Sequence, residues 1–200
     1  MIDFRRVLIP DRMKHLECDR RGYPIFFTAL RDDSGRAHFQ INNTDKRNRC
    51  FRRDLCSICG GRLLRGRWFV GGPKCAFDIH GAYLDPPMHQ ECVHYALLVC
   101  PYLAAPNYAK LIGRATLPAD DALSTIDQQE LLSPTTADDV RPDLFVAVHA
   151  RGQRLERTEY GIIGRPFRPY IKFEYWRHGR QLTPEEIASW ILLERRTGPR

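Results

Sequence analysis

The residues of this chain with the clearest chemistry are two pairs of metal-ligand type. Cys56 and Cys59 are separated by two residues, and His89 and Cys92 repeat that spacing after a gap of 29 residues. Two ligands three positions apart can hold one ion from a tight turn or from a single turn of helix. Three thiolates and one imidazole complete a tetrahedral shell around Zn²⁺ and leave no position for water. The spacing therefore predicts one structural zinc ion.

The other cysteines suit a metal less well. The chain has seven cysteines, an odd number, and its first residues lack the apolar segment of a signal peptide, so we expect a reducing cytoplasm and free thiols. Cys50 and Cys75 are alternative ligands or reactive thiols, although neither has a second ligand at chelating distance in the sequence. Cys100 is expected to be a small buried apolar side chain, and Cys18 has no neighbour at metal spacing.

The sequence around both pairs predicts the elements that would present the ligands. Gly60-Gly61 permits a tight knuckle whose backbone N–H groups point at the sulfur atoms. Residues 63–64 and 68–70 are expected to form a short hairpin. Asp85, followed by two prolines, predicts the start of a helix that ends before Pro101 and carries the second pair in its first turn. Knuckle, hairpin and helix in this order are the layout of a treble-clef zinc finger.

The flanking sequence predicts further strands and a final helix. Residues 25–30 and 37–41 enclose turn-forming residues and indicate an N-terminal hairpin, while residues 144–150 and 170–176 are expected to be strands. Thr183 to Glu186 is a capping box, so a helix should follow and pack through Ile187, Trp190 and Ile191. We therefore predict an α+β fold in which a treble-clef-like finger lies between an N-terminal β-hairpin and a C-terminal antiparallel sheet plus helix.

The predicted elements divide the chain into three segments. Residues 1–112 would hold the hairpin and the finger, and residues 143–200 the C-terminal strands and helix. Residues 113–142 are acidic and rich in proline, which indicates a linker or insertion with one short helix near residues 124–132. We expect the outer two segments to share one compact unit, because neither has enough apolar sequence for a core of its own.

Arginine is concentrated around the predicted zinc site. The net charge is +7, and residues 46–67 contain eight basic side chains but a single acid, Asp54. Seven of the eight are arginines, whose planar guanidinium groups match phosphate better than lysine does. The residues predicted to bind a nucleic acid or an acidic partner are Lys46, Arg47, Arg49, Arg52, Arg53, Arg62, Arg65 and Arg67. The alternative is a solvated basic face that only keeps the protein soluble.

Several stretches of the first half resemble a group of uncharacterised phage and prophage zinc-binding proteins. They are Arg21 to Ile25, Leu55 to Gly60, Phe69 to Pro73, Asp85 to Cys92, Tyr95-Ala96 and Cys100 to Leu103. The C-terminal part is similar only loosely. The resemblance implies a mobile-element origin and a place in the cytoplasm of a bacterial host, and it implies no reaction.

An HNH-type metal-dependent nuclease is the enzyme alternative, because that superfamily builds on a related ββα element. Such a site needs a general-base histidine and groups that hold a divalent ion against the scissile phosphate. Asp78, His80 and His94 are the candidates for these roles. The HNH motif itself is missing from the sequence, and a shared fold does not carry a catalytic site with it. Binding is therefore favoured over catalysis.

The sequence is compatible with two kinds of partner. Nucleic acid, either DNA or RNA, would be recognised mainly through backbone phosphate, because nothing in the sequence resembles a base-reading helix. The other candidate is a host protein of the defence or transcription machinery, inhibited by a phage-encoded modulator. No motif for a small-molecule substrate is evident. The longest apolar stretch, residues 95–105, is too short to cross a membrane and is interrupted by proline.

Overall fold

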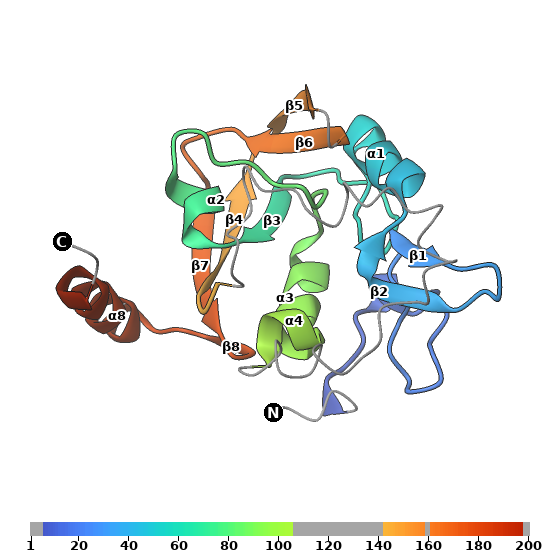
Figure 1. Cartoon of the computed structure of the whole chain (residues 1–200), viewed down its shortest axis with the longest axis horizontal. Helices are drawn as coiled ribbons and strands as arrows, with labels where there is room; N and C mark the ends of the chain where they lie inside the picture. Colours follow the sequence, from blue (N-terminus) through green and yellow to red (C-terminus); the bar gives the residue numbers. More distant parts are fainter. Residues whose placement is uncertain (1–5, 106–141, 159–160, 198–200) are drawn as a thin grey trace.

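In the parts of the chain that the structure describes, three antiparallel sheets and several short helices form a mixed α+β fold (Figure 1). The computed structural model describes residues 6–105, 142–158 and 161–197. Its strands are β1 (Ala29–Arg31), β2 (Ala37–Asn42), β3 (Arg67–Gly71), β4 (Phe145–Ala150), β5 (Gln153–Thr158), β6 (Gly161–Pro166), β7 (Lys172–Arg177) and β8 (Arg180–Gln181). The pairs β1–β2 and β5–β6 are two-stranded sheets, and the other strands form one sheet in the order β3-β4-β7-β8.

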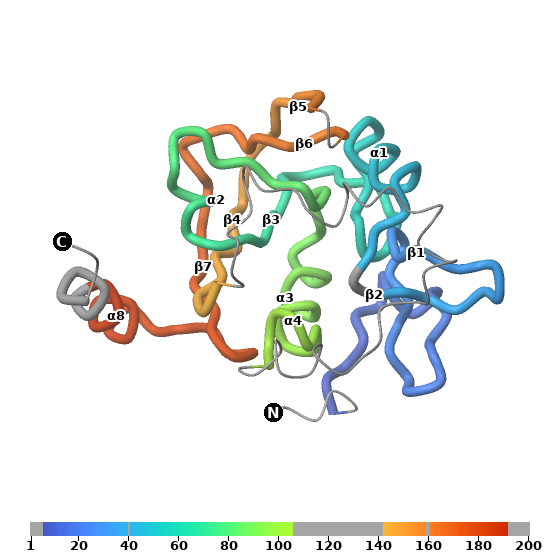
Figure 2. Tube along the Cα trace, in the orientation of Figure 1, coloured from blue at the N-terminus to red at the C-terminus, as the bar shows by residue number. Residues whose placement is uncertain are grey.

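The described helices are short. They are a 3-10 turn at Asp11–Met13, α1 (Thr44–Arg53), α2 (Pro73–Phe77), α3 (Gln90–Val99), α4 (Pro101–Ala104) and α8 (Pro184–Thr197). Of these, α2 and α3 are the ones that pack against the four-stranded sheet. Figure 2 shows β3 beside β4, although β4 follows it by more than seventy positions in the sequence. This pairing brings the finger region and the C-terminal region into one sheet.

Alternate residues of each strand point to opposite sides of that sheet, and a cluster of buried apolar side chains lies on each side. On one side Trp68, Ala147 and Trp176 pack in the same cluster as the cysteines of the candidate metal site and the inner face of α3. On the other side Phe69 and Val148 belong to a separate cluster beneath α2. The β3–β4 pair therefore supplies apolar surface to both halves of the core.

Several predicted strands are confirmed, with one shift at a boundary. The strands expected at 144–150 and 170–176 are β4 and β7, and the N-terminal hairpin is β1 and β2. Its first strand begins at Ala29 rather than at residue 25. The reason is a competing set of hydrogen bonds, because the N–H groups of Phe27 and Thr28 donate to the knuckle carbonyls of Ile58 and Ser57 at 2.8 and 3.1 Å.

The basic stretch before the first cysteine pair, for which the sequence predicted no helix or strand, is the helix α1. Asn43 caps it, since its side chain accepts a hydrogen bond from the N–H of Lys46 at 3.0 Å. Arg47, Cys50 and Phe51 face inward at helical spacing and are buried. The amphipathic pattern is hard to recognise in the sequence, because most residues of this stretch are charged and one of the buried positions is an arginine.

The predicted second hairpin and the predicted start of the following helix are both wrong, for one physical reason. Residues 63–64 do not pair with 68–70. Trp68 instead exchanges two backbone hydrogen bonds with Met88, at 2.8 and 3.1 Å, and along its other edge the whole of β3 pairs with β4. Because Met88 is held in this bridge, the helix cannot begin at Asp85. It begins at Gln90, with His89 as its N-cap residue.

The C-terminal region contains one hairpin that the sequence analysis did not find. This hairpin is β5–β6, which packs beside α1. The final helix begins at the predicted capping box, where Thr183 and Glu186 exchange hydrogen bonds. Of the three side chains expected to pack, Ile187 and Trp190 are part-buried and Ile191 is 37% exposed, and Figure 1 shows α8 standing away from the sheets. The acidic segment, apart from Pro142, lies outside the described residues.

Candidate metal centre

The four predicted ligands meet at one point. The ligand atoms of Cys56, Cys59, His89 and Cys92 all lie within 4.8 Å of one another. The three thiols are buried in the core cluster, with exposed fractions of 0 to 3%. Soft thiolate ligands with one imidazole, closely spaced and shielded from water, suit Zn²⁺ better than Mg²⁺ or Ca²⁺. The donor set therefore fits the structural zinc ion that the spacing predicts.

The first ligand pair is presented by a knuckle closed by backbone hydrogen bonds. The N–H of Cys56 donates to Gly61 at 2.8 Å, and the N–H of Gly60 donates back to Cys56 at 2.8 Å. Gly60 has φ of 72° and the ring of Phe27 lies 2.8 Å from where its Cβ would be, so no other residue fits there without strain. The N–H of Cys59 also points at the sulfur of Cys56, at 3.5 Å.

The second pair is presented by the start of α3. His89 is the N-cap residue and Cys92 lies in the first helical turn, where the positive end of the helix dipole favours a thiolate. Two sets of backbone hydrogen bonds hold the residues that precede α3. One is the Trp68–Met88 bridge, and in the other the N–H of Ser57 donates to the carbonyl of Pro87 at 3.1 Å. Knuckle and helix are thus joined independently of any ion.

The orientation of His89 decides which of its nitrogens would bind metal. Its Nδ1 lies 3.4 Å from the sulfur of Cys59, while its Nε2 lies 3.1 Å from the carbonyl oxygen of Arg62. Because a carbonyl can only accept, Nε2 carries a proton, which leaves Nδ1 as the nitrogen that would bind a metal ion. The hydrogen bond to Arg62 is the kind of supporting contact that holds metal-binding imidazoles in place.

The four candidate ligands share protons that a bound cation would displace. Hydrogen bonds from Cys56 and Cys92, and from the N–H of Gly61, lower the pKa of Cys59 despite its burial. The neighbouring Cys56 and Cys59 raise the pKa of His89 to about 10. A bound divalent cation would replace this shared proton, so the affinity for metal should fall as the pH is lowered.

The two alternative cysteine ligands lie outside this group. Cys50 is buried on α1, where its sulfur lies 4.0 Å from the carbonyl oxygen of Cys56, and it is not a member of the group of four ligand atoms. Burial raises the pKa of the Cys50 thiol to about 12, which makes it unreactive at neutral pH. Cys75 is on α2, against Gly71 and on the other side of the sheet.

The structure separates the eight predicted binding residues into two groups. Exposed side chains without an ion pair to any described residue are Arg49, Arg52, Arg53, Arg62 and Arg65. The others have structural contacts. Arg47 is 5% exposed and donates to the carbonyls of Leu84 and Ile162, and Arg67 pairs with Asp54 at 2.7 Å. The ammonium group of Lys46 lies over the ring of Phe27.

The three candidate catalytic residues are not brought together. His94 lies on α3 and packs against Trp68 and Trp176 on the side of the metal ligands. Asp78 and His80 follow α2 in the loop on the opposite side of the sheet, where Asp78 accepts a hydrogen bond from the N–H of His80. The structure therefore gives no shared site for the general base and metal-holding groups of an HNH-type nuclease.

His94 instead has a partner that the sequence analysis did not single out, the buried carboxylate of Glu174. His94 donates to it at 2.8 Å, Lys172 forms an ion pair with it at 2.7 Å, and the indole N–H of Trp176 donates at 3.2 Å. Burial alone would raise the pKa of Glu174, but the contacts with Lys172 and His94 outweigh it, so the pKa lies below the usual 4.5. The only signal in the sequence was an acid on the same strand face as a tryptophan.

We expect Glu174→Gln to lower the free energy of unfolding by about 2 kcal/mol, since hydrogen bonds to a buried charge are worth about 1.5–3 kcal/mol. That change corresponds to a loss of roughly 4–8 °C in Tm for a chain of this size. Because the folded pKa is depressed, the contribution is complete above pH 4.5 and is lost as the pH falls through the folded pKa. Thermal unfolding at neutral and acidic pH measures both effects.

The matched control is Glu156→Gln, because Glu156 pairs with Arg165 at a site where its side chain is 42% exposed. Exposed ion pairs contribute about 0–1 kcal/mol, so this variant should melt close to the parent protein. Equal losses in both variants would contradict the role assigned to the buried carboxylate.

Comparisons with known proteins give no relative for this chain: no family model, curated protein or solved structure matches it. Among the helices of the described residues, none combines the length and apolar character needed to cross a lipid bilayer. The metal centre and the surface around it are therefore the parts of the molecule from which its function can be inferred.

Proposed function

We propose that this chain is a zinc-binding, treble-clef-like protein that binds nucleic acid through the arginines around its metal centre. The observation that carries the proposal is the separation described above. Five arginines remain exposed and without described acidic partners, whereas Arg47 is buried and Arg67 forms an ion pair with Asp54. Unpaired guanidinium groups of one sign are what a phosphate backbone requires.

The metal centre contributes by fixing the loop that carries two of these arginines. His89 donates to the backbone of Arg62, and Arg65 follows on the same short loop before β3. With Nδ1 bound to a cation, the imidazole keeps its Nε2 proton and its hydrogen bond to that carbonyl. The ion in this proposal has a structural role, because three thiolates and one imidazole leave no ligand position for a substrate.

The character of the surface supports recognition of backbone over bases. Arg49, Arg52 and Arg53 lie on the outside of α1, and they alternate with residues that are buried in the core. The helix is therefore anchored through its inner side, and its exposed positions from Arg49 to Arg53 are all arginines, while its exposed acid, Asp45, lies in the first turn. The resemblance of the finger region to phage proteins belongs to the same proposal, with DNA or RNA inside a bacterial cell as the partner.

Fluorescence anisotropy with labelled oligonucleotides across salt concentrations tests this function. Five phosphate contacts imply a slope of log K against log salt of about −3.5 for single strands and about −4.5 for duplex. Affinity should then fall by roughly a hundredfold to several hundredfold between 50 and 200 mM salt. No binding at 50 mM salt, or binding that is insensitive to salt, would reject the proposal.

A protein partner is the second candidate, and one observation favours it. The rings of Phe77 and Phe173 meet at 5.7 Å, and both are nearly half exposed beside the exposed Ile79 and Ile171. Apolar patches of this kind occur at protein interfaces. A host protein bound here would stay bound at salt concentrations that release nucleic acid.

A further inference from the structure

A second row of arginines begins just before β5 and continues along it, on alternating faces of the strand, outside residues 46–67. Arg151, Arg154 and Arg157 are exposed, and none of them forms an ion pair with a residue that the structure describes. The acid on this strand, Glu156, is already paired with Arg165 at 2.6 Å. The outer edge of the β5–β6 hairpin is therefore strongly basic.

This row is joined to the arginines of α1 by two structural arginines. Arg67 pairs with Asp54 at the end of α1 and also donates to the carbonyl of Arg151 at 3.1 Å. Arg47 donates from the other end of α1 to the carbonyl of Ile162 on β6, at 2.7 Å. The helix and the hairpin therefore lie side by side.

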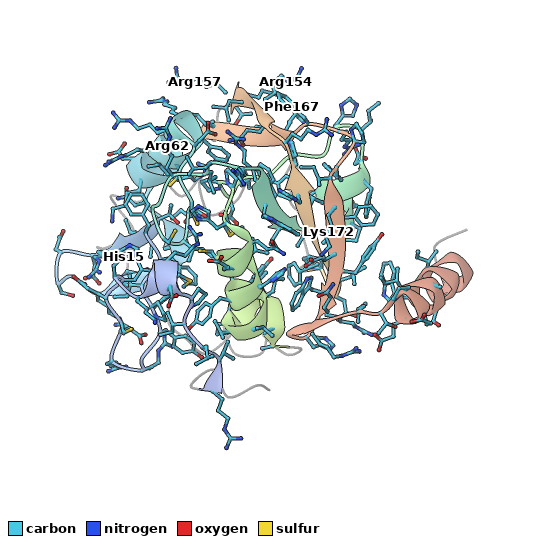
Figure 3. All side chains as sticks on the ribbon, turned by 180° about the vertical axis from the view of Figure 1, so that it is seen from behind. His15, Arg62, Arg154, Arg157, Phe167 and Lys172 are labelled. Carbon is cyan, nitrogen blue, oxygen red and sulfur yellow. The ribbon has the colours of Figure 1, made fainter. Side chains whose placement is uncertain are left out.

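Phe167 places an aromatic ring at the end of this hairpin. Its N–H donates to the carbonyl of Gly152 at 2.9 Å, and two of its ring carbons lie 2.9 Å from where a Cβ of Gly152 would be. The ring therefore rests on bare backbone, and the residue remains 53% exposed. Arg154 lies two residues beyond Gly152 and so shares the face on which the ring sits, whereas Arg157, three positions further along the strand, points to the opposite face. Figure 3 shows Arg154, Arg157 and Phe167 at one end of the molecule, with Arg62 on the same side.

From this arrangement we infer that the β5–β6 hairpin is the second half of the nucleic-acid surface and binds single strands, with Phe167 stacking on an unpaired base. This inference rests on the proposed function and adds the strand preference and the stacking residue. A half-exposed ring held by backbone, beside arginines that track phosphates, is the combination found in single-strand binding grooves. In a duplex the base faces are already stacked, so the ring would gain no contact.

The test compares Phe167→Ala with Phe173→Ala, using a labelled oligothymidylate and a duplex of equal length as probes. Both phenylalanines are about half exposed, but Phe173 lies in the aromatic patch beneath α2. Loss of one stacked base should weaken single-strand binding by about tenfold in Phe167→Ala, and Phe167→Trp should restore it. Phe173→Ala should bind as the parent does. Binding of the duplex should be weaker in the parent and unchanged by either alanine variant.

The arginine row is tested by the double variant Arg154→Glu, Arg157→Glu against Arg20→Glu, Arg36→Glu, which makes the same change of charge at exposed arginines near the N-terminus. The first pair should weaken single-strand binding more than tenfold and flatten the salt slope, whereas the second should have a small effect. Failure of the parent to bind any probe would reject the proposed function itself. Binding that is lost in α1 variants but unaffected at Phe167, Arg154 and Arg157, or that is as tight for duplex, would overturn this inference alone.

Discussion

Cys56→Ser is expected to abolish stoichiometric zinc and to remove the cooperative thermal transition of the region around the finger. Cys56 is fully buried at the centre of the larger core cluster and belongs to the knuckle that holds the first ligand pair. Structural zinc sites supply roughly 10–16 kcal/mol of apparent binding free energy, which is as large as the whole stability of a typical domain. Elemental analysis of freshly purified protein and near-UV circular dichroism measure the two losses.

Two other cysteines provide matched controls for this experiment. Cys50→Ala removes an equally buried thiol that lies outside the ligand group, and Cys18→Ser changes an exposed one. Both variants should keep one zinc per chain, with at most a modest loss of Tm for the buried site. Alkylation should reach Cys18 in the native protein and the ligand cysteines only after chelation. Less than half an equivalent of zinc in the parent, or full zinc in Cys56→Ser, would refute the assigned site.

The triple variant Arg52→Glu, Arg53→Glu, Arg65→Glu is expected to lower affinity for nucleic acid more than a hundredfold. Each exposed arginine exchanged for an acid removes a phosphate contact and adds repulsion, so three changes alter the local charge by six units. Zinc content and Tm should stay close to those of the parent, because these side chains make no described ion pair that the fold needs. Anisotropy at fixed low salt, with zinc analysis of the same sample, provides the measurement.

Arg47→Ala should show the opposite pattern. This side chain is buried and donates to the carbonyls of Leu84 and Ile162, so its loss leaves buried acceptors unpaired. Stability should fall by about 2–4 kcal/mol, while the folded fraction retains most of its affinity. If the triple variant binds as tightly as the parent, the arginines form only a solvated face and the proposed function fails.

The candidate site was predictable because its determinants are local. Each ligand pair spans three positions, and a short turn or a helix start fixes both members, so spacing alone indicated Cys56 with Cys59 and His89 with Cys92. The strand at residues 145–150 was also recognisable, since a continuous apolar run buried on both faces is distinctive.

The errors arose where distant partners decide the local structure. Nothing near Trp68 indicates that Met88 will hold it on one edge and β4 on the other, yet these contacts removed the expected hairpin and moved the helix start. The β5–β6 hairpin was missed because its strand residues are mostly charged or small. The position of Glu174 opposite His94 likewise depends on how α3 crosses the sheet, which no local pattern encodes.

The pairing of β3 with β4 also affects how the chain folds as it is made. The ribosome must add 74 residues after Gly71 before Phe145 appears, which takes ~4–15 s at ~5–20 residues per second. Once Cys92 has been added, all four candidate metal ligands are available, and the Met88 bridge can form on one edge of β3. The other edge, with Phe69 beside it, has no strand to pair with. Unpaired strand edges recruit other chains, so we expect a nascent chain of this protein to be most prone to aggregation before β4 is made.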